Sequence, residues 1–248
     1  MNKVYAFSDI HGMYELWEQI KEYCDDSDVI YFLGDAADRG PHGYKIMREL
    51  LTDKRVFYLL GNHDEFLLHI GADLIEGHNS NVMLWIANGG QPTIQDFLRQ
   101  PIEQQEWILR KLNQLHRKVI YVNKNGQILH LSHAGQSLDE DLELLRLKGE
   151  DIENLLIWDR QHIQDPWPQD EEYQNQYVIH GHTPTKSLAQ FGAHITEPPK
   201  IGVPGVYANG HKIDIDTGCF ASGSIPLFDL DELKVAKIFT IKTKEEEK

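Results

Sequence analysis

Five short motifs rich in Asp, His, Asn and Arg each follow an apolar run, and they constrain the fold more than any other feature of the chain. The motifs are Asp9-Ile10-His11-Gly12, Gly34-Asp35-Ala36-Ala37-Asp38-Arg39-Gly40, Gly61-Asn62-His63-Asp64, His133-Ala134-Gly135 and His180-Gly181-His182. The first three come after predicted buried strands at 3–7, 29–33 and 56–60, and helical periodicity at 13–23 and 44–51 separates these strands. This alternation predicts parallel strands joined by right-handed helical crossovers. Ligands collect beyond the carboxyl ends of such strands, so we expect the polar residues to face one crevice.

The remainder of the chain divides into a helical stretch and a β-rich stretch. Residues 65–118 carry apolar residues at helical spacing, with a break at Asn88-Gly89-Gly90. Further strands are predicted at 119–122, 127–131, 177–179, 212–215, 227–228 and 235–241, and 166–176 is predicted to be an acidic loop. No internal repeat or linker divides the sequence. We therefore expect a single domain over 1–248, with a mostly helical insertion around 65–118.

Charge and composition exclude several classes of protein. The chain has 39 Asp and Glu against 24 Lys and Arg, and its net charge of -15 argues against a nucleic-acid groove, which needs clustered cations. A phosphate substrate is compatible with this charge because bound divalent cations reverse the local field. Cys24 and Cys219 fit no disulfide framework. No signal peptide or membrane-spanning apolar run is visible, so we expect a cytoplasmic protein that does not associate with membranes.

The residue types in the motifs suit a metal centre. Asp9 and His11 are two positions apart, so on a continuing strand their side chains would share a face. Carboxylate, amide and imidazole ligands without a thiolate suit Mn²⁺, Fe²⁺ or Zn²⁺ rather than Cu⁺. A bridging carboxylate holds two ions roughly 3.5–4 Å apart in phosphoesterase sites, and Asp35 is the central candidate. Each motif alone is compatible with an ordinary turn or a surface histidine, whereas all five in this order favour one centre.

These motifs resemble those of the calcineurin-like metallophosphoesterases. The similarity is to the branch that contains the serine/threonine protein phosphatases, the phage-type phosphatases and the bacterial diadenosine tetraphosphatases. It extends over residues 9–182, and Asp214-Ile215-Asp216-Thr217-Gly218 adds a less specific match. The resemblance implies an α/β fold in which a mixed β-sandwich is flanked by helices. One departure is Ala36-Ala37, where the eukaryotic protein phosphatases usually carry Tyr-Val, and it weakens any transfer of their regulatory partners.

The resemblance also implies a cofactor of two divalent metal ions, with Mn²⁺ expected first and Fe²⁺ or Zn²⁺ as alternatives. One ion would be held by Asp9, His11 and a bridging Asp35. The second ion would be held by the same Asp35 together with Asn62, His133 and His182.

A catalytic pair and a phosphate-binding arginine complete the implied site. His63 would be the general acid for the leaving group, and Asp38 would orient it and hold its protonated form. Arg39 would bind phosphate oxygens, because its planar fork matches their geometry. A metal-bridging hydroxide would attack phosphorus in line.

Three further features each have two interpretations. Arg160 is expected to contact phosphate as well, the alternative being a surface arginine paired with the carboxylate before it. Asn88-Gly89-Gly90 with Thr93 resembles a loop of phage-type and tetraphosphatase members that would cap the cleft, or it is a helix C-cap followed by a turn. His130 and His180 lie within apolar runs and are expected to be structural, with His180 alternatively supporting the metal site.

The leading functional prediction is a metal-dependent phosphatase of the serine/threonine protein phosphatase type, acting on a phosphorylated protein or a small phosphate ester. The alternative is a symmetrical diadenosine tetraphosphate hydrolase, which uses the same metal core but must hold two nucleosides. A second alternative is a catalytically inactive metal-binding scaffold, which is disfavoured because no ligand or acid is missing. A nuclease is disfavoured by the acidic charge and by the Asp38-Arg39 pair. No peptide-binding module is visible, and the sequence predicts no oligomeric state.

Overall fold

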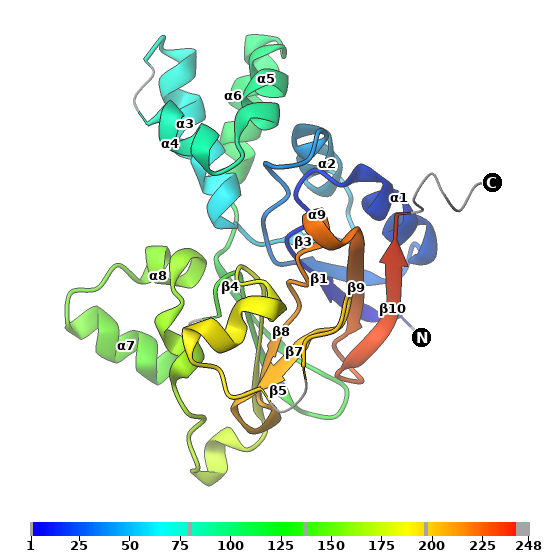
Figure 1. Ribbon diagram of the computed structural model, residues 1–248, viewed down its shortest axis with the longest axis vertical. Helices are drawn as coiled ribbons and strands as arrows, with labels where there is room; N and C mark the ends of the chain where they lie inside the picture. Colours follow the sequence, from blue (N-terminus) through cyan, green and yellow to red (C-terminus); the bar gives the residue numbers. More distant parts are fainter. Residues whose placement is uncertain (1, 79–80, 136–137, 196–197, 242–248) are drawn as a thin grey trace.

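The computed structural model in Figure 1 describes residues 2–78, 81–135, 138–195 and 198–241. Its strands form two five-stranded sheets, with the orders β10-β9-β1-β2-β3 and β4-β5-β6-β8-β7. The strands are β1 (Val4–Phe7), β2 (Val29–Phe32), β3 (Val56–Tyr58), β4 (Lys118–Val122), β5 (Ile128–Ser132), β6 (Gln176–His180), β7 (Gly205–Tyr207), β8 (Lys212–Asp214), β9 (Ser224–Asp229) and β10 (Lys234–Thr240).

Helices flank both sheets, which confirms the predicted α/β sandwich class. The α-helices are α1 (Tyr14–Tyr23), α2 (Gly43–Leu50), α3 (Asn62–Ile75), α4 (Val82–Ala87), α5 (Gln91–Leu98), α6 (Ile102–Leu112), α7 (Asp139–Leu147), α8 (Ile152–Trp158) and α9 (Cys219–Ser222). The 3-10 helices are η1 (Gln161–Gln164), η2 (Glu171–Tyr173), η3 (Thr185–Phe191) and η4 (Ala208–Gly210). Among the described residues, no helix combines the length and the apolar character needed to cross a bilayer.

The first sheet is covered on both faces at its central strand, β1. Strands β1, β2 and β3 are parallel, with α1 and α2 as the crossovers, as the sequence predicts. Side chains alternate along β1: Tyr5 and Phe7 pack with α1 and α2, whereas Val4 and Ala6 pack toward the second sheet. A strand covered on both faces appears in the sequence as a continuous apolar run, which explains why this strand was predictable.

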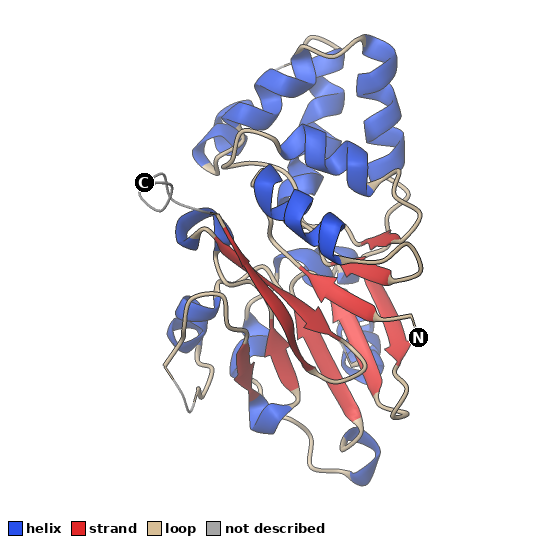
Figure 2. Ribbon diagram, turned by 90° about the vertical axis from the view of Figure 1, so that its right-hand side faces the viewer, coloured by secondary structure: helices blue, strands red, loops and turns tan. Residues whose placement is uncertain are grey.

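The core between the sheets is formed by short aliphatic residues. Leu129 and Leu131 of β5 meet Ile179 of β6 and Ile213 of β8 in one cluster with the inward residues of β1. The second sheet is mixed, because β5, β6 and β8 run parallel while β4 and β7 pair antiparallel at its edges. Figure 2 shows the strands of the two sheets as the central layers of the molecule.

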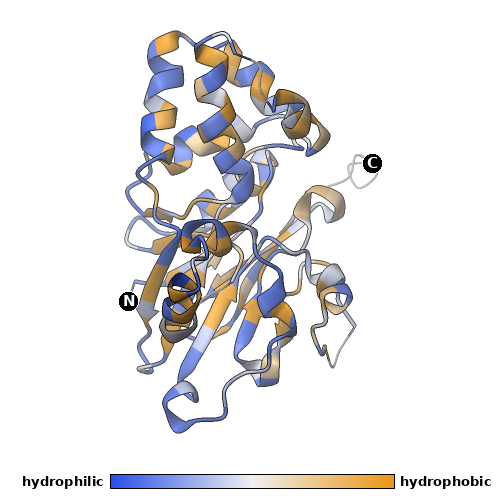
Figure 3. Ribbon diagram, turned by 90° about the vertical axis from the view of Figure 1, so that its left-hand side faces the viewer, coloured by the Kyte–Doolittle hydropathy of each residue, from blue (hydrophilic) through white to orange (hydrophobic). Residues whose placement is uncertain are grey.

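Helices α3 to α6 gather at one end of the molecule, beyond the carboxyl end of β3 (Figures 1 and 2). They occupy most of the stretch for which helical periodicity is expected. Figure 3 shows mixed hydrophobic and hydrophilic colouring along these helices, as expected where one helix face is buried and the other is hydrated. Their apolar faces join the cluster that covers the first sheet, through Leu67, Trp85, Phe97 and Ile108.

Several elements of the described chain are absent from the sequence-based expectation, including the short helix α9 and the 3-10 helices. Helices α7 and α8 lie in the part that reads as β-rich, and β7 was not predicted. The short strand expected at 227–228 is part of the longer β9, whose residues are all buried. Cys24 and Cys219 are both buried and unpaired, in agreement with the absence of a disulfide framework.

Candidate metal centre

The loops that follow β1 and β2 lie side by side and bring the first two motifs together. The N–H of Asp9 donates to the Gly34 carbonyl oxygen at 3.0 Å. The N–H of His11 donates to the Asp35 carbonyl oxygen, also at 3.0 Å. Asp9 and His11 have φ of 54° and 43°, and β1 ends before them at Phe7. The expectation that they share a face on a continuing strand is therefore wrong, since it is the left-handed backbone of this loop that carries both side chains.

Left-handed backbone is concentrated in the predicted site. Ten non-glycine residues of the described chain have positive φ, and six of them are predicted site residues: Asp9, His11, Asp35, Asp38, Arg39 and His182. Such conformations cost free energy for side chains with a Cβ atom, and they persist where surrounding contacts enforce them. The tertiary structure thus holds these residues in place against their local preference.

Asp35 lies at the junction of two groups of possible metal ligands. Ligand atoms of His11, Asp35 and His63 lie within 4.8 Å of one another, and so do those of Asp9, Asp35 and His133. Asp35 Oδ2 lies 3.4 Å from His133 Nε2 and 3.7 Å from His11 Nε2. All five residues are at most 5% exposed.

Asn62 and His182 extend this cluster on one side. Asn62 Oδ1 lies 2.9 Å from His133 Nε2 and 2.9 Å from His182 Nδ1. Asn62 is the first residue of α3, and the next N–H of that helix, from His63, donates to Asp35 Oδ1 at 2.9 Å. The free N–H groups of a helix N-terminus favour an anion there, so the start of α3 positions both an amide ligand and the central carboxylate.

The hydrogen bonds of the histidines fit a bound cation. His11 Nδ1 and His133 Nδ1 each lie 2.8 Å from a backbone carbonyl oxygen, that of Ala37 and that of Leu33. A carbonyl only accepts, so each Nδ1 carries a proton and each Nε2 faces the cluster, where its lone pair binds a metal once the ring is neutral, as in metal-ligating histidines. Burial lowers the pKa of His11 and of His182 well below the ordinary value, which favours the neutral form that binds metals.

Electrostatics in the cluster also fit a cation. Burial raises the pKa of Asp9 to about 6. Burial also opposes ionisation of Asp35, but His133 and His63 outweigh it and hold the pKa of Asp35 well below its usual range. Burial disfavours a proton on His133, whereas Asp35 and Asp9 raise its pKa to about 9. Buried carboxylates need positive charge, and divalent ions would supply more of it than one imidazolium.

The predicted acid pair lies against the first ligand group. His63 Nδ1 lies 2.8 Å from Asp38 Oδ2, and Asp38 has no exposed surface. The other ring nitrogen, Nε2, lies 3.0 Å from Arg39 Nη2. The same guanidinium group contacts His11 Nε2 through Nη1. Arg39 therefore lies between a possible ligand and the predicted acid.

Arg160 lies within electrostatic reach of the cluster. It follows α8 and is half-buried, with its guanidinium 5.5 Å from the centre of the Phe191 ring. Burial lowers its pKa, and Asp9 and Asp35 act in the opposite direction. The preceding Asp159 instead accepts from the backbone N–H and Nδ1 of His162, both at 3.1 Å. In the described residues, no ion pair links Asp159 to Arg160.

Asp64 is an important residue to which the sequence assigned no chemistry. Its carboxylate accepts four backbone N–H groups, from Asp35 at 2.9 Å, Ala36 and Ala37 at 3.1 Å, and Gly61 at 3.2 Å. It has no exposed surface. Asp64 thereby fixes the loop that carries Asp35. The third position of a helix that starts at a strand end is the signal from which this role follows.

The two histidines expected to be structural lie outside the donor cluster. His180 Nε2 lies 2.8 Å from the Tyr207 hydroxyl, and His130 Nε2 lies 2.7 Å from Gln176 Oε1. His180 is also adjacent to the backbone that supports a ligand, since the N–H of Gly181 donates to the His133 carbonyl oxygen at 2.9 Å.

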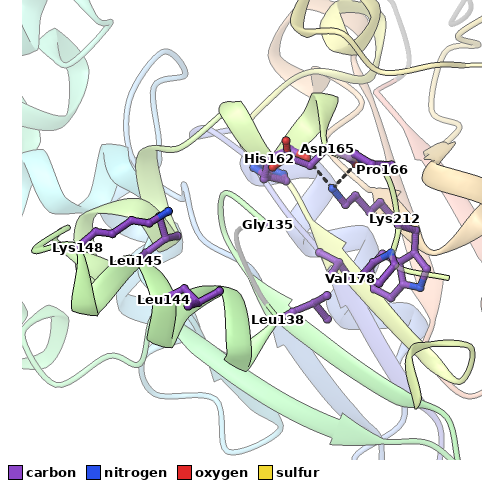
Figure 4. A pocket seen from close by; sticks show the side chains of 12 residues that line it. Gly135, Leu138, Leu144, Leu145, Lys148, His162, Asp165, Pro166, Val178 and Lys212 are labelled. Atoms are coloured by element: carbon purple, nitrogen blue, oxygen red, sulfur yellow. Dashed lines mark hydrogen bonds between the residues drawn. The ribbon is translucent and has the colours of Figure 1, made fainter. Parts of the chain in front are cut away.

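A cavity of about 340 Å³ lies beside Gly135, two residues after the possible ligand His133, as Figure 4 shows. Its lining combines leucines of α7 with Val178 and Trp167. The Lys212 ammonium group at its edge donates to the carbonyl oxygens of His162 at 2.5 Å and Asp165 at 3.1 Å. The cavity is mainly apolar and contributes no ligand to the donor cluster.

Comparisons with known proteins identify the family of the chain. A sequence model of the calcineurin-like phosphoesterases matches residues 2–212. The chain is 25% identical to the asymmetrical bis(5'-nucleosyl)-tetraphosphatase PrpE of Bacillus cereus (strain Q1), over 93% of this chain and 91% of that protein. It is 28% identical to the symmetrical bis(5'-nucleosyl)-tetraphosphatase of Buchnera aphidicola (strain 5A), over 61% of this chain but only 51% of that protein.

Solved structures support the fold. A metallophosphoesterase from Sphaerobacter thermophilus superposes with a TM-score of 0.55 at 14% identity, covering 99% of this chain and 90% of that one. A cold-active protein-tyrosine phosphatase of a psychrophilic Shewanella superposes with a TM-score of 0.52 at 18% identity, covering 98% and 81%. At these identities the likeness concerns the fold alone.

Proposed function

Because the chain belongs to the calcineurin-like phosphoesterases, we propose that it is a metal-dependent phosphoesterase whose substrates are bis(5'-nucleosyl) tetraphosphates. The observation that carries the catalytic part is the position of Asp35, which belongs to both groups of buried donors. The relatives that align with most of the chain support the substrate class. This reverses the order in which the sequence alone ranks a phosphoprotein and a dinucleotide.

Two divalent ions would be held by the residues that surround Asp35. Asp9 and His11, whose Oδ1 and Nε2 atoms lie 3.9 Å apart, would complete one site, while Asn62, His133 and His182 would complete the other. When bound, the ions supply Lewis acidity toward phosphate oxygens and lower the pKa of bound water. The oxygen and nitrogen donors suit Mn²⁺, with Fe²⁺ or Zn²⁺ as alternatives.

Arg39 and Arg160 would bind and orient the phosphate chain. The Arg39 guanidinium lies between His11 and His63, so a phosphate oxygen that meets it is also close to the donor cluster. A planar fork favours one orientation of a phosphate, which a lysine ammonium would not impose. A chain of four phosphates offers oxygens to both arginines at once.

Arg39 Nη2 lies 3.0 Å from His63 Nε2, so His63 would carry a proton there only once the guanidinium turns to the phosphate, and it would then transfer this proton to the oxygen of the leaving group. Asp38 Oδ2 accepts the hydrogen bond from His63 Nδ1–H at 2.8 Å, which fixes the orientation of the ring. Both residues are buried, so water does not compete for this hydrogen bond.

An aromatic wall beside the cluster supports a nucleoside-containing substrate. The Phe66 ring packs edge-to-face on Trp158, with centroids 5.4 Å apart, and Trp158 lies 6.4 Å from the His182 ring. Phe66 and Trp158 are only partly buried. Trp158 is held by its indole N–H, which donates to Glu65 Oε2 at 2.9 Å. A fixed, partly exposed aromatic surface beside a phosphate site suits a nucleobase.

Side-by-side kinetics test this proposal. Metal-stripped protein is supplied with Mn²⁺ and given diadenosine tetraphosphate, a phosphoserine peptide and p-nitrophenyl phosphate. We expect turnover only with metal, and a kcat/KM for the dinucleotide at least about tenfold above that for the peptide, which corresponds to about 1.4 kcal/mol. The nucleotide products identify the cleaved bond, because ATP with AMP means asymmetrical cleavage and two ADP means symmetrical cleavage. A preference for the peptide would contradict the substrate class.

One observation favours a second candidate, a phosphomonoesterase of the protein phosphatase type. A buried acid such as the His63–Asp38 pair is needed most when the leaving group is an alkoxide, because an alkoxide is a far stronger base than a phosphate oxygen. No turnover of any substrate with any divalent ion would instead favour the metal-binding scaffold.

A further inference from the structure

A third side chain continues the hydrogen-bonded pair of His63 and Asp38. The indole N–H of Trp85 lies 3.0 Å from Asp38 Oδ1 and 2.8 Å from Asp38 Oδ2. Trp85 has no exposed surface although its helix, α4, exposes Met83 and Leu84. The indole N–H of Trp85, which both carboxylate oxygens share, and the ring of His63 together fix the rotation of the Asp38 carboxylate.

We propose that Trp85 is a positioning residue, which orients His63 through Asp38 for proton transfer to the leaving group. The inference rests on the proposed phosphoesterase function and deepens it. Without the indole N–H, Asp38 Oδ1 would be left without this donor in a site closed to water. The carboxylate would rotate toward other donors, and the direction of the His63 Nδ1–H bond would be lost with it.

The turn after α4 keeps the indole in this position. A Cβ atom on Gly90 would lie 2.2 Å from Trp85 Cδ1 and 2.4 Å from its Nε1, so any side chain there would displace the ring. The N–H of Gly90 also donates to the Trp85 carbonyl oxygen at 2.9 Å. Glycine at position 90 is therefore required by the packing of the indole rather than by its own φ, which is -72°.

The same turn and the start of α5 hold the backbone on which Asp38 and Arg39 lie. The Gly89 carbonyl oxygen accepts the N–H of Arg39 at 2.9 Å. The Thr93 hydroxyl accepts the N–H of Asp38 at 2.8 Å, and Thr93 is 1% exposed. The segment is the helix C-cap and turn of one sequence-based interpretation, since Asn88 is the C-cap of α4, and it also supports the backbone of Asp38 and Arg39.

A change of Trp85 to Phe tests the proposal, because it keeps an aromatic ring and removes the N–H. Proton donation matters most for a poor leaving group, so we compare phenyl phosphate with p-nitrophenyl phosphate. We expect W85F to lower kcat for phenyl phosphate roughly 10- to 100-fold and kcat for p-nitrophenyl phosphate only a few-fold, with KM nearly unchanged. In a His63→Asn background, W85F should cause no further change in the ratio of kcat for p-nitrophenyl phosphate to kcat for phenyl phosphate, because the group that Trp85 orients is gone.

Trp167→Phe is the matched control. Trp167 is 3% exposed, and its indole N–H donates to the Tyr173 carbonyl oxygen at 3.1 Å, in a cluster separate from the site. It should leave the ratio of the two esters unchanged. Equal losses for both esters in W85F, or the same change of ratio in W167F, would overturn the proposal.

A measurement without metal or substrate separates this inference from the proposed function. In protein labelled with ¹⁵N at its five tryptophans, the Trp85 indole signal is identified by its loss in W85F. We expect Asp38→Asn to shift this signal and to speed its hydrogen exchange, while the Trp167 signal stays in place. A Trp85 signal that does not move would refute the hydrogen bond. If neither the esters nor diadenosine tetraphosphate is turned over, the proposed function fails, and the indole signal alone decides the geometry.

Discussion

Asp64 determines much of the site's geometry although it is not one of the possible metal ligands. Its four N–H partners belong to Gly61 and to the consecutive residues 35–37, so one carboxylate ties the loop after β2 to the start of α3. Asp35 and Asn62, which are possible metal ligands, lie on these two segments. The separation of these ligands is therefore set by a residue that is not itself proposed as a ligand.

Asp64→Asn is expected to destabilise the metal-free protein by about 1–3 kcal/mol, because the new NH₂ group would face backbone donors and leave them unsatisfied. Mn²⁺ binding should weaken as well. Urea unfolding and calorimetric titration measure the two effects. Asp96→Asn, on an exposed ion pair with Arg99, is the control and should change neither quantity. A stable D64N protein with unaltered Mn²⁺ affinity would contradict the proposal that Asp64 holds the loop after β2 against the start of α3.

His63 is expected to matter differently for esters and for anhydrides. A phenolate leaving group needs a proton, whereas a nucleotide leaves as a phosphate oxygen that is already a weak base. His63→Asn should therefore lower kcat for phenyl phosphate roughly 10²-fold or more, and kcat for diadenosine tetraphosphate by less than about tenfold. Steady-state kinetics on both substrates measure this. Equal losses would mean that His63 acts by binding phosphate rather than by donating a proton.

Between the elements, α3 and α8 face each other beside the cluster and form the aromatic wall of Phe66 and Trp158. Trp158→Leu should raise KM for diadenosine tetraphosphate about 5- to 10-fold, since stacking of one base contributes about 1–3 kcal/mol. KM for p-nitrophenyl phosphate should stay within about twofold, because that ester has no nucleobase to stack. Trp107→Leu, a change on α6 at a partly buried residue of the core, is the control. A parallel rise for both substrates would show a general distortion of the site.

Some helices and strands could be predicted from local sequence patterns, and others could not. Strands β1 to β3 and helices α1 and α2 were predictable because their apolar residues follow simple periods of buried structure. Helices α7 and α8 were missed although 139–158 has leucines at helical spacing, a signal obscured by the strands on either side. The three-residue β7 has no periodic signal, since it pairs only with β8 at the sheet edge.

The candidate site residues could be listed from the sequence, but their arrangement could not. Positive φ at Asp9 and His11 results from hydrogen bonds to the loop after β2, which is distant in sequence. The support of Asp38 by Trp85 joins residues 47 positions apart. Such contacts depend on how the loop after β2 packs against α4 and the turn that follows it, and no local pattern specifies them.

Across the whole molecule, the two sheets are tied together at the end away from the donor cluster. Asp231, in the turn between β9 and β10, accepts from the Tyr121 hydroxyl on β4 at 2.8 Å and pairs with Lys124 Nζ at 2.5 Å. The adjacent Leu230 N–H donates to the Val4 carbonyl oxygen, at the amino end of β1. Asp231 is 2% exposed, so these bonds are largely shielded from water.

Asp231→Asn is expected to destabilise the fold by about 1–3 kcal/mol at pH 7 and to leave activity unchanged. Burial opposes ionisation of Asp231, but the hydrogen bonds from Lys124 and Tyr121 outweigh it and lower its pKa. A lowered folded-state pKa gives stability that is present above the unfolded pKa of about 3.9 and is lost as pH falls through the folded value. The free energy of unfolding, measured in urea, should thus differ between wild type and D231N by a constant amount from about pH 5 to 8. This difference should become smaller below about pH 4.

The control for this pair is Glu232→Gln, because Glu232 forms an exposed ion pair with Lys234 at 3.4 Å in the same turn. It should change the free energy of unfolding by less than about 0.5 kcal/mol at any of these pH values. If the difference in free energy of unfolding between wild type and D231N stays constant down to pH 3, the ion pair contributes nothing and only the shape of the side chain matters.

Metal removal should affect the stability of the whole molecule, because the donor cluster joins both sheets. Asp35 follows a strand of the first sheet, whereas His133 and His182 follow strands of the second, so the ion held by these three residues would cross-link the sandwich. At a free Mn²⁺ concentration of about 100 times Kd, the folded state gains about 2.7 kcal/mol. For a chain of this size that corresponds to an increase in Tm of roughly 5–10 °C over protein in EDTA. Asp35→Asn should abolish most of the increase, while the remote Asp231→Asn should lower both Tm values and keep the difference between them. Equal Tm values with Mn²⁺ and with EDTA in the wild type would contradict an ion bound at the junction of the sheets.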